Sequence, residues 1–282
     1  MEVMKAVLFG IVEGITEWLP ISSTGHMILL DEFVKLEVSD GFYSVFQVVI
    51  QLGAILAVAV LFWSDFFPFG KSQTSAPLGH RGIAAWIRKE QWNLWGKILA
   101  ACVPAAVAGV LFGETLEAMF YNYRTVALAL IVFGAAFLIV EDRQKGKTPK
   151  IGSLEALDYP TAVLIGVFQL IAAVFPGTSR SGATIVGALL LGVSRGVAAR
   201  FTFFLAIPVM FGASLLKLVQ SGLCFSRSEL SILVVGMAVA FVVSMFVIRF
   251  LMEYIRSQNF KVFGWYRIAL GVLVLLYFTV LR

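Results

Sequence analysis

The chain has 282 residues, of which 60% are hydrophobic and only 14% are charged, and its mean hydropathy is +0.91. Soluble domains of this length are far more polar, so the composition excludes an ordinary soluble enzyme. The net charge of +5 indicates a membrane setting rather than a nucleic-acid partner, because the basic residues fall in loops between apolar segments.

Uncharged apolar runs of near membrane-spanning length recur along the chain. The clearest is FYSVFQVVIQLGAILAVAVLFW at 42–63, which carries no charge over the roughly 20 residues that a helix needs to cross a bilayer. Similar runs lie near 96–113, 124–141, 201–217, 230–249 and 262–281. The sequence therefore predicts an all-α integral membrane protein that crosses the bilayer several times.

The N-terminal segment 1–30 is apolar but interrupted by EGITEWLPISSTGH at 13–26. Pro20 disfavours helix at the residue before it and donates no backbone hydrogen bond. Broken backbone at membrane depth is tolerated only where it lines a cavity enclosed by protein. We therefore expect 1–30 to form a re-entrant helix–loop–helix hairpin that enters and leaves on the same side.

The same plan returns in the second half of the chain. The stretch GIVEGITEWLPISSTGH aligns without gaps on GVFQLIAAVFPGTSRSG, which predicts a second re-entrant hairpin over 161–190. This alignment pairs Gly10 with Gly166, Pro20 with Pro176, Ser23 with Ser179 and Thr24 with Arg180. Three spans follow each hairpin, and because three is odd we expect the second half to be inverted. The predicted units are a first half at 1–141, a basic cytoplasmic linker at 142–160 and a second half at 161–282.

Basic residues are concentrated on one predicted side of the membrane. Of the 22 Lys and Arg residues, 15 fall on the side opposite the N-terminus, 6 fall on the N-terminal side, and Arg180 is assigned to the interior. Because basic loops remain in the cytoplasm, we expect both termini and the opening of the first hairpin to face outward.

Two acids in the first hairpin suggest a metal site. Glu13 and Glu17 are four residues apart and share one face of a helix. In a low-dielectric setting they need a proton, an arginine or a cation between them. A hard divalent cation such as Mg²⁺ or Ca²⁺ accepts such oxygen ligands and commonly bridges carboxylates to phosphate. The alternative is that both acids only cap helix ends or face water.

Hydroxyl residues and a histidine follow the proline. At least one of Ser22, Ser23 and Thr24 is expected to cap the next helix, and another to act as nucleophile or phosphate ligand. His26 follows Ser23 by three residues, so the two can share a face, and a histidine there can act as general acid or base. The alternative for His26 is a packing role.

The second loop, PGTSRSGAT at 176–184, predicts an anion site. Gly177 permits unusual backbone angles, and Arg180 supplies a planar fork that suits phosphate oxygens. Further ligands are the hydroxyls of Thr178, Ser179 and Ser181 and the free N–H groups that begin the next helix. The alternative is that Arg180 only extends toward the membrane surface.

These motifs together resemble the bacterial undecaprenyl-diphosphatase (bacitracin-resistance protein) family, and the resemblance covers essentially the whole chain. It implies a metal-dependent phosphatase of the bacterial plasma membrane. Such an enzyme removes the terminal phosphate of undecaprenyl diphosphate at the outer face and so recycles the carrier lipid of the cell wall. It also implies catalytic roles for Glu17, Ser23, His26 and Arg180, and it adds Thr184 to the motif.

Two questions stay open at this level. Hairpins that meet at the membrane midplane are typical of carriers, so a lipid-phosphate flippase or secondary transporter is the alternative function. Attack on phosphorus by Ser23 and attack by water are both compatible with the residues. The expected partners are the prenyl diphosphate lipid and the bilayer, with no nucleic acid. The GVLFG stretch at 109–113 can pack helices within a subunit or form a homo-oligomer.

Overall fold

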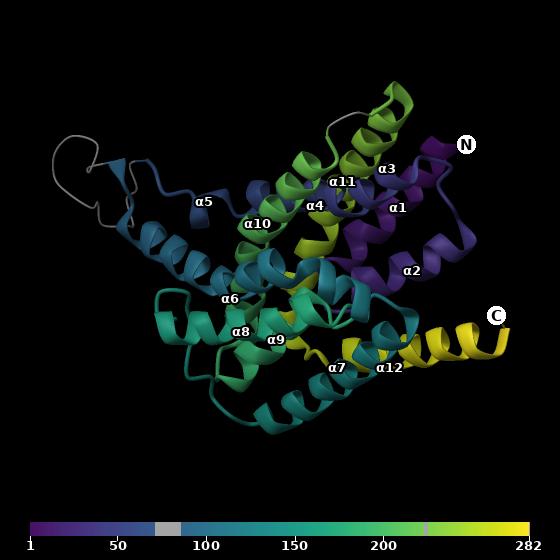
Figure 1. The fold of residues 1–282 in the computed structure, drawn as a ribbon. Helices are drawn as coiled ribbons and strands as arrows, with labels where there is room; N and C mark the ends of the chain where they lie inside the picture. Colours follow the sequence, from purple (N-terminus) through teal and green to yellow (C-terminus); the bar gives the residue numbers. More distant parts are fainter. Residues whose placement is uncertain (71–85, 223–224, 282) are drawn as a thin grey trace.

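The computed structural model describes residues 1–70, 86–222 and 225–281. In these ranges the regular structure is helical and no strand is formed beyond isolated bridges (Figure 1), which confirms the all-α prediction. The elements are α1 Glu2–Thr16, α2 Ser23–Phe33, α3 Asp40–Val49, α4 Gln51–Leu61, α5 Trp63–Phe66, α6 Lys89–Phe120, α7 Tyr123–Gln144, α8 Tyr159–Val174, α9 Arg180–Leu190, α10 Arg195–Gln220, α11 Arg227–Ser257, α12 Lys261–Leu276 and the short π-helix η2 Tyr277–Leu281. Lys71 and Arg81, two of the basic residues counted on the side opposite the N-terminus, lie outside the described residues.

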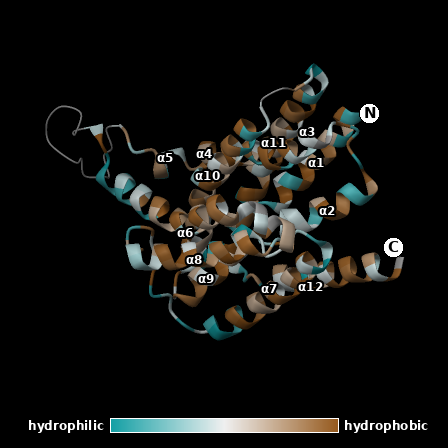
Figure 2. Ribbon diagram, in the orientation of Figure 1, coloured by the Kyte–Doolittle hydropathy of each residue, from teal (hydrophilic) through white to brown (hydrophobic). Residues whose placement is uncertain are grey.

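Six helical segments among the described residues are long and apolar enough to cross a membrane. They are Gly41–Leu61, Lys89–Gly113, Tyr123–Gln144, Arg195–Gln220, Arg227–Ser257 and Lys261–Val280. Each coincides with one of the six runs predicted from hydropathy. Figure 2 shows their hydrophobic bodies and more hydrophilic ends. A seventh apolar helix, Tyr159–Val174, is shorter.

The two interrupted segments fold as helix–loop–helix units. The first consists of α1, with 15 residues, and α2, with 11. The second consists of α8, with 16 residues, and α9, with 11. Each helix is shorter than the roughly 20 residues that a span requires. The breaks therefore fall where the prolines predict them.

Helix packing follows the same pattern in the two halves. The first hairpin packs through α1 against α11, and the second packs through α8 against α6. The last helices of the halves, α7 and α12, pack against each other and lie side by side in Figure 1. Large apolar side chains fill the space between the hairpins and the spans. Trp18, for example, is fully buried edge-on against Phe203, with 5.2 Å between ring centroids.

Glycines allow α7 and α12 to approach closely. A Cβ built on Gly134 would lie 2.7 Å from the Gly264 carbonyl oxygen, and one built on Gly271 would lie 2.7 Å from the Ala127 carbonyl oxygen. The same shift in numbering relates Gly134 to Gly271 and Ala127 to Gly264. The two contacts are therefore equivalent, because each joins a glycine of one helix to the backbone of the other at matching positions. By the same shift in numbering, Leu130 of α7 corresponds to Arg267 of α12.

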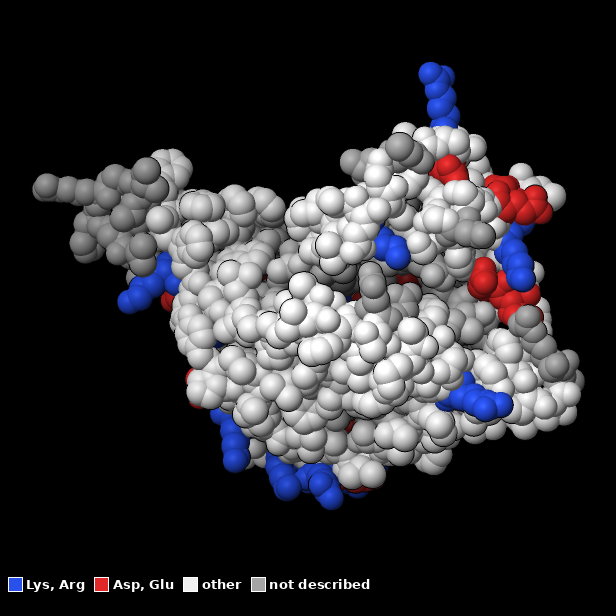
Figure 3. All heavy atoms as spheres, viewed as in Figure 1, with Lys and Arg blue, Asp and Glu red and all other residues white. Residues whose placement is uncertain are grey.

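Charge is distributed unevenly over the surface. In Figure 3 acidic side chains gather beside the N-terminus, and a group of basic side chains lies along the opposite, lower-left edge. Both termini lie at the same edge of the molecule in Figure 1. The arrangement agrees with a one-sided distribution of basic loops, and the orientation in a membrane stays a prediction.

Candidate active site

Each hairpin turns on a serine in a left-handed backbone conformation. Ser22 has φ 74° and accepts a hydrogen bond from the Gly25 N–H at 3.3 Å. Ser179 has φ 67° and accepts one from the Gly182 N–H at 3.1 Å. Among the described residues these are the two non-glycine positions with positive φ. Such backbone costs about 1–3 kcal/mol and concentrates at functional sites. Both serine hydroxyls serve as helix caps, which is the role expected of one hydroxyl in the first loop.

The matching caps correct the gapless alignment of the two motifs. Ser22, rather than Ser23, is the structural equivalent of Ser179, so Ser23 corresponds to Arg180. The second loop has one residue more between its proline and its capping serine. Gly177 accommodates it with φ 92°, at a point where a Cβ would lie 2.5 Å from the Val126 carbonyl oxygen. A glycine is required there, because no side chain fits.

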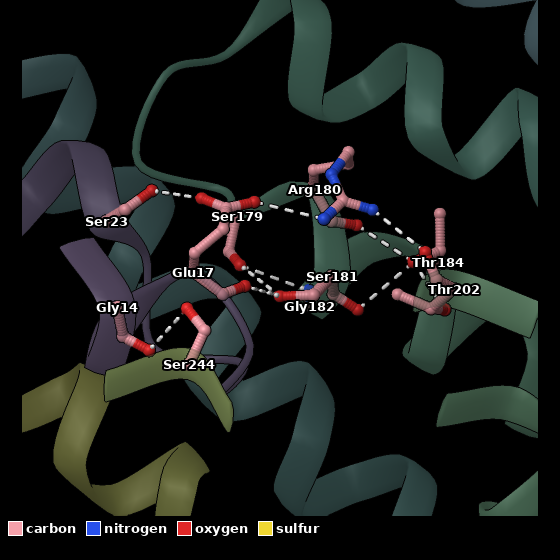
Figure 4. Close-up of polar contacts among 10 residues, drawn as sticks. All are labelled: Gly14, Glu17, Ser23, Ser179, Arg180, Ser181, Gly182, Thr184, Thr202 and Ser244. Carbon is pink, nitrogen blue, oxygen red and sulfur yellow. Dashed lines mark hydrogen bonds and ion pairs between the residues drawn. The ribbon is translucent and has the colours of Figure 1, made fainter. Parts of the chain in front are cut away.

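The Glu17 carboxylate joins the two loops (Figure 4). Its Oε2 accepts a hydrogen bond from Ser23 Oγ at 2.7 Å, and its Oε1 accepts one from Arg180 Nη2 at 3.0 Å. Only 8% of the Glu17 side chain and 13% of the Arg180 side chain are exposed. The structurally equivalent residues Ser23 and Arg180 thus hold the two oxygens of one carboxylate. No acidic residue lies close to Arg180 in the sequence, and its carboxylate partner comes from the other hairpin.

A second group of hydrogen bonds holds Arg180 in position. Its Nη1 donates to the Thr202 carbonyl oxygen at 2.9 Å. The Thr202 hydroxyl donates to Thr184 Oγ1 at 2.8 Å, and the Thr184 hydroxyl lies 2.9 Å from the Arg180 carbonyl oxygen. Ser181 Oγ donates to the Glu17 carbonyl oxygen at 3.2 Å. The predicted residues Ser181 and Thr184 therefore support the ion pair, and Thr202, which sequence reasoning missed, completes the network.

Glu13 lies one helical turn before Glu17 and is 1% exposed. Its Oε1 is buried and has no hydrogen-bond partner in the described part of the chain. Glu17 is close enough for the two carboxyl groups to interact. No group of three or more His, Cys, Asp or Glu side chains in metal-binding proximity occurs among the described residues. Two carboxylates with an unused oxygen fit a hard cation whose other ligands are water and phosphate.

His26 has different neighbours from those expected. Its Nδ1 lies 2.7 Å from the Ser22 carbonyl oxygen, and its Nε2 lies 2.7 Å from the Tyr266 hydroxyl. A carbonyl only accepts, so Nδ1 carries the proton, and Nε2 of the neutral ring accepts from Tyr266. The two rings stack with an interplanar angle of 4°. The sequence allowed His26 to share a helix face with Ser23, and in the structure its ring contacts Tyr266 of α12 instead.

Arg267 of α12 is a second interior arginine, whereas the sequence analysis assigned only Arg180 to the interior. It is fully buried, and its guanidinium donates to the carbonyl oxygens of Pro20 at 3.3 Å, Gly177 at 3.0 Å and Thr178 at 2.7 Å. One side chain therefore ties the two loops together. The signal in the sequence was a single charge within the apolar run 262–281, since an ionisable residue inside a span usually has a function.

The remaining predicted ligands lie at the edges of this centre. Thr178 is fully buried, and its hydroxyl has no hydrogen-bond partner in the part of the chain that the structure describes. Thr24 is half-buried at the start of α2, and Ser179 Oγ lies 3.1 Å from Ser181 Oγ. Glu13 and Glu17 thus lie at the end of α1, and the other predicted residues fall in the two loops or in the first two turns of the helices that follow them.

Comparison with known proteins agrees with these motifs. The family model of the bacitracin resistance protein BacA matches residues 6–273. The chain belongs to this family. Undecaprenyl-diphosphatase of Desulfitobacterium hafniense is 59% identical over 99% of this chain and 97% of its own length. Undecaprenyl-diphosphatase 1 of Clostridium acetobutylicum is 56% identical over 99% and 98%, and undecaprenyl-diphosphatase of Acetivibrio thermocellus is 55% identical over the whole of both chains.

Proposed function

We propose that this protein is an integral membrane phosphatase that hydrolyses undecaprenyl diphosphate to undecaprenyl phosphate and inorganic phosphate, and so recycles the carrier lipid for cell-wall precursors. Membership of the BacA family along nearly the whole chain supports the reaction. The observation that carries the assignment of the site is the carboxylate of Glu17, held by Ser23 from one loop and Arg180 from the other.

The second loop is suited to hold the diphosphate. The Arg180 guanidinium has a buried Nε without a partner among the described residues, besides the Nη2 that contacts Glu17. When phosphate oxygens replace Glu17, the fork of the guanidinium can bind two of them. The first N–H groups of α9 and the Thr178 hydroxyl supply further donors. Binding would thus release Glu17 from its ion pair as the substrate enters.

Glu13 and Glu17 are the residues that would hold a divalent cation, Mg²⁺ or Ca²⁺. The unpartnered Oε1 of Glu13 and the proximity of the two carboxylates support this proposal. A bound cation supplies positive charge to the phosphoryl oxygens, as cations commonly do in phosphoryl transfer. Arg180 contributes the same kind of stabilisation from the opposite loop.

Ser23 is positioned to lose its proton to Glu17. In a nucleophilic route, Ser23 Oγ bonds to the terminal phosphorus, its proton passes to Glu17 Oε2, and the bond from phosphorus to the bridging oxygen breaks. Undecaprenyl phosphate then leaves, and water hydrolyses the phosphoserine. In the alternative route Ser23 orients a water that attacks directly. The geometry favours Glu17 over His26 as the acceptor of the Ser23 proton, and His26 remains a proposed proton carrier whose Nε2 is paired with Tyr266.

We further infer that the two halves form an inverted repeat with re-entrant hairpins, and that the site opens at the outer face of the plasma membrane. The equivalent caps at Ser22 and Ser179 support the repeat. So does the packing of each hairpin against a span of the other half, α1 against α11 and α8 against α6. The short hairpin helices support re-entry. The one-sided distribution of basic residues supports the orientation.

A phosphate-release assay tests the function. The purified full chain in detergent is given undecaprenyl diphosphate and Mg²⁺, and inorganic phosphate is measured with and without chelator. We expect release that stops with chelator and returns when Mg²⁺ or Ca²⁺ is added. Uptake of lipid into vesicles without phosphate release would instead establish the transporter.

A trapping experiment separates the two routes of attack. Rapid acid quenching of turnover with substrate labelled in the terminal phosphate should retain label on the protein if Ser23 is the nucleophile. The label should be absent from Ser23→Ala. Normal turnover by that variant would exclude the phosphoserine.

A further inference from the structure

A polar cavity of about 460 Å³ lies away from the two catalytic loops. It is formed by α5, by the first turns of α6 and α10, and by the segment 152–155 that precedes α8. Its charged and amide side chains are Asp65, Arg88, Glu90, Gln91, Asn93, Lys97, Glu155 and Arg200. These segments lie on the side to which the sequence assigns most of the basic residues.

Lys97 is the unusual member of this cavity. It is only 4% exposed, and its Nζ donates to the carbonyl oxygens of Leu154 at 3.4 Å and Glu155 at 3.3 Å. No carboxylate among the described residues lies within 4.0 Å of the ammonium group. Buried charges are normally paired, and two long bonds to carbonyls compensate an ammonium only in part. The third N–H of Lys97 is left for an anion.

Two of the three acids of the cavity are engaged, and the third, Glu90, is exposed at the start of α6. Asp65 forms an ion pair with Arg200. A hydrogen bond from Ser153 and the attraction of Arg200 and Lys97 hold the pKa of Glu155 below its usual value, so this carboxyl group is ionised. Two buried polar atoms of the lining have no partner among the described residues, Arg200 Nε and Gln91 Oε1. The buried part of the lining therefore offers two unused cationic donors, on Lys97 and Arg200, and one unused acceptor, in the amide of Gln91.

We propose that this cavity binds inorganic phosphate, with Lys97 and Arg200 on its oxygens. At neutral pH hydrogen phosphate carries both negative oxygens and one P–O–H group. Its oxygens suit the free donors of Lys97 and Arg200, and its hydroxyl suits the acceptor Gln91 Oε1. Sulfate has the same shape and charge but no proton to donate to Gln91. The site should therefore prefer phosphate to sulfate.

The cavity communicates with the catalytic centre through α10. Arg200 lines the cavity, and Thr202, two residues further along the same helix, accepts the hydrogen bond from Arg180 through its carbonyl oxygen. The proposed reaction releases inorganic phosphate, and the cavity offers that product a second place to bind. The site stands on its own contacts, however, and does not depend on the proposed reaction.

Phosphate binding in an Arg180→Ala background tests the proposal, because that change weakens phosphate at the proposed catalytic centre. Equilibrium dialysis of labelled inorganic phosphate against the full-length protein in detergent at neutral pH should still detect one site. Lys97→Met in the same background should weaken binding at least about tenfold, the effect expected for a lost charge-assisted hydrogen bond. Lys97→Arg should retain most of the affinity. Lys145→Met removes an exposed charge outside the cavity and should leave affinity within about twofold.

Gln91→Leu sharpens the test by probing the P–O–H contact. Sulfate should compete at least about tenfold less well than phosphate with the parent protein, and this preference should be lost in the variant. Thermal unfolding of each variant separates loss of binding from loss of fold. The proposal is overturned if the Arg180→Ala protein binds no phosphate, or if a folded Lys97→Met variant binds it equally well. A short prenyl monophosphate that binds in a Lys97-dependent manner where inorganic phosphate does not would assign the cavity to a lipid headgroup and also overturn it.

Discussion

The two hairpin loops share one backbone design and differ in chemistry. Ser22 and Ser179 make the same left-handed cap, yet the next residue is a serine in the first loop and an arginine in the second. Both of these residues contact the carboxylate of Glu17. Likewise, Leu130 beside the first loop corresponds to Arg267 beside the second. The same backbone conformation in two loops thus brings a neutral hydroxyl, from Ser23, and a cation, from Arg180, to the carboxylate of Glu17. A single loop would supply only one of these two groups at that position.

The largest effect is expected from breaking the contact between the loops at Arg180. Arg180→Ala removes the cation that stabilises charge on the phosphoryl group and leaves Glu17 buried without its partner. We expect kcat/KM for phosphate release to fall at least about 10³-fold. Arg180→Lys keeps the charge but loses the planar guanidinium, so its activity should lie between those of the parent protein and Arg180→Ala. A loss of less than tenfold in Arg180→Ala would show that the ion pair is structural.

The adjacent serines of the first loop should behave differently. Ser23→Ala removes the group that donates to Glu17 and should lower kcat at least about 10²-fold with little change in stability. Ser22→Ala removes a helix cap and should cost about 1 kcal/mol of unfolding free energy, with activity within about tenfold. Ser179→Ala is the matched change in the second loop and should resemble Ser22→Ala. Equal kinetic effects of Ser22→Ala and Ser23→Ala would contradict the distinction between cap and reactive group.

Replacing Arg267 tests whether the hydrogen bonds that hold the two loops together matter for catalysis. Arg267→Leu introduces the residue found at the equivalent position of α7, so the helix packing is preserved while the bonds to three loop carbonyls are lost. We expect about a 10²-fold loss of kcat, because small displacements of catalytic groups are costly, together with a lower unfolding temperature. Leu130→Met provides a control that should change stability by less than about 1.5 kcal/mol. Wild-type kinetics in a folded Arg267→Leu protein would remove Arg267 from the site.

The smallest effect concerns Tyr266, whose hydroxyl contacts His26 of the first hairpin. Tyr266→Phe keeps the ring stacked on His26 and removes one hydrogen bond to Nε2, a contribution of about 1 kcal/mol. We expect kcat to fall about three- to tenfold and the pH profile of kcat to shift. His26→Ala should reduce activity further. An unchanged pH profile in Tyr266→Phe would indicate that His26 does not transfer a proton during turnover.

Local properties of the sequence were enough to predict much of this protein. Hydropathy predicted the six helices of span length found among the described residues, because a membrane helix satisfies its own backbone and its apolar length is visible along the chain. Pro20 and Pro176 marked both breaks, because proline ends a helix wherever it stands. The composition of the two motifs singled out Glu17, Ser23 and Arg180 and led to the family.

Only the tertiary structure decided how these residues meet. The register of the second loop depends on the positive φ of Gly177, which the sequence does not display, so the gapless alignment paired the wrong serines. The partners of Glu17, His26 and the loop carbonyls come from segments 163, 240 and 247 residues away. Contacts over such separations arise from the packing of whole helices, here α12 against α7 and the two hairpins against each other. The sequence therefore determines which groups are present and where the chain breaks, and the packing of the halves determines which groups share a proton, a charge or a ligand.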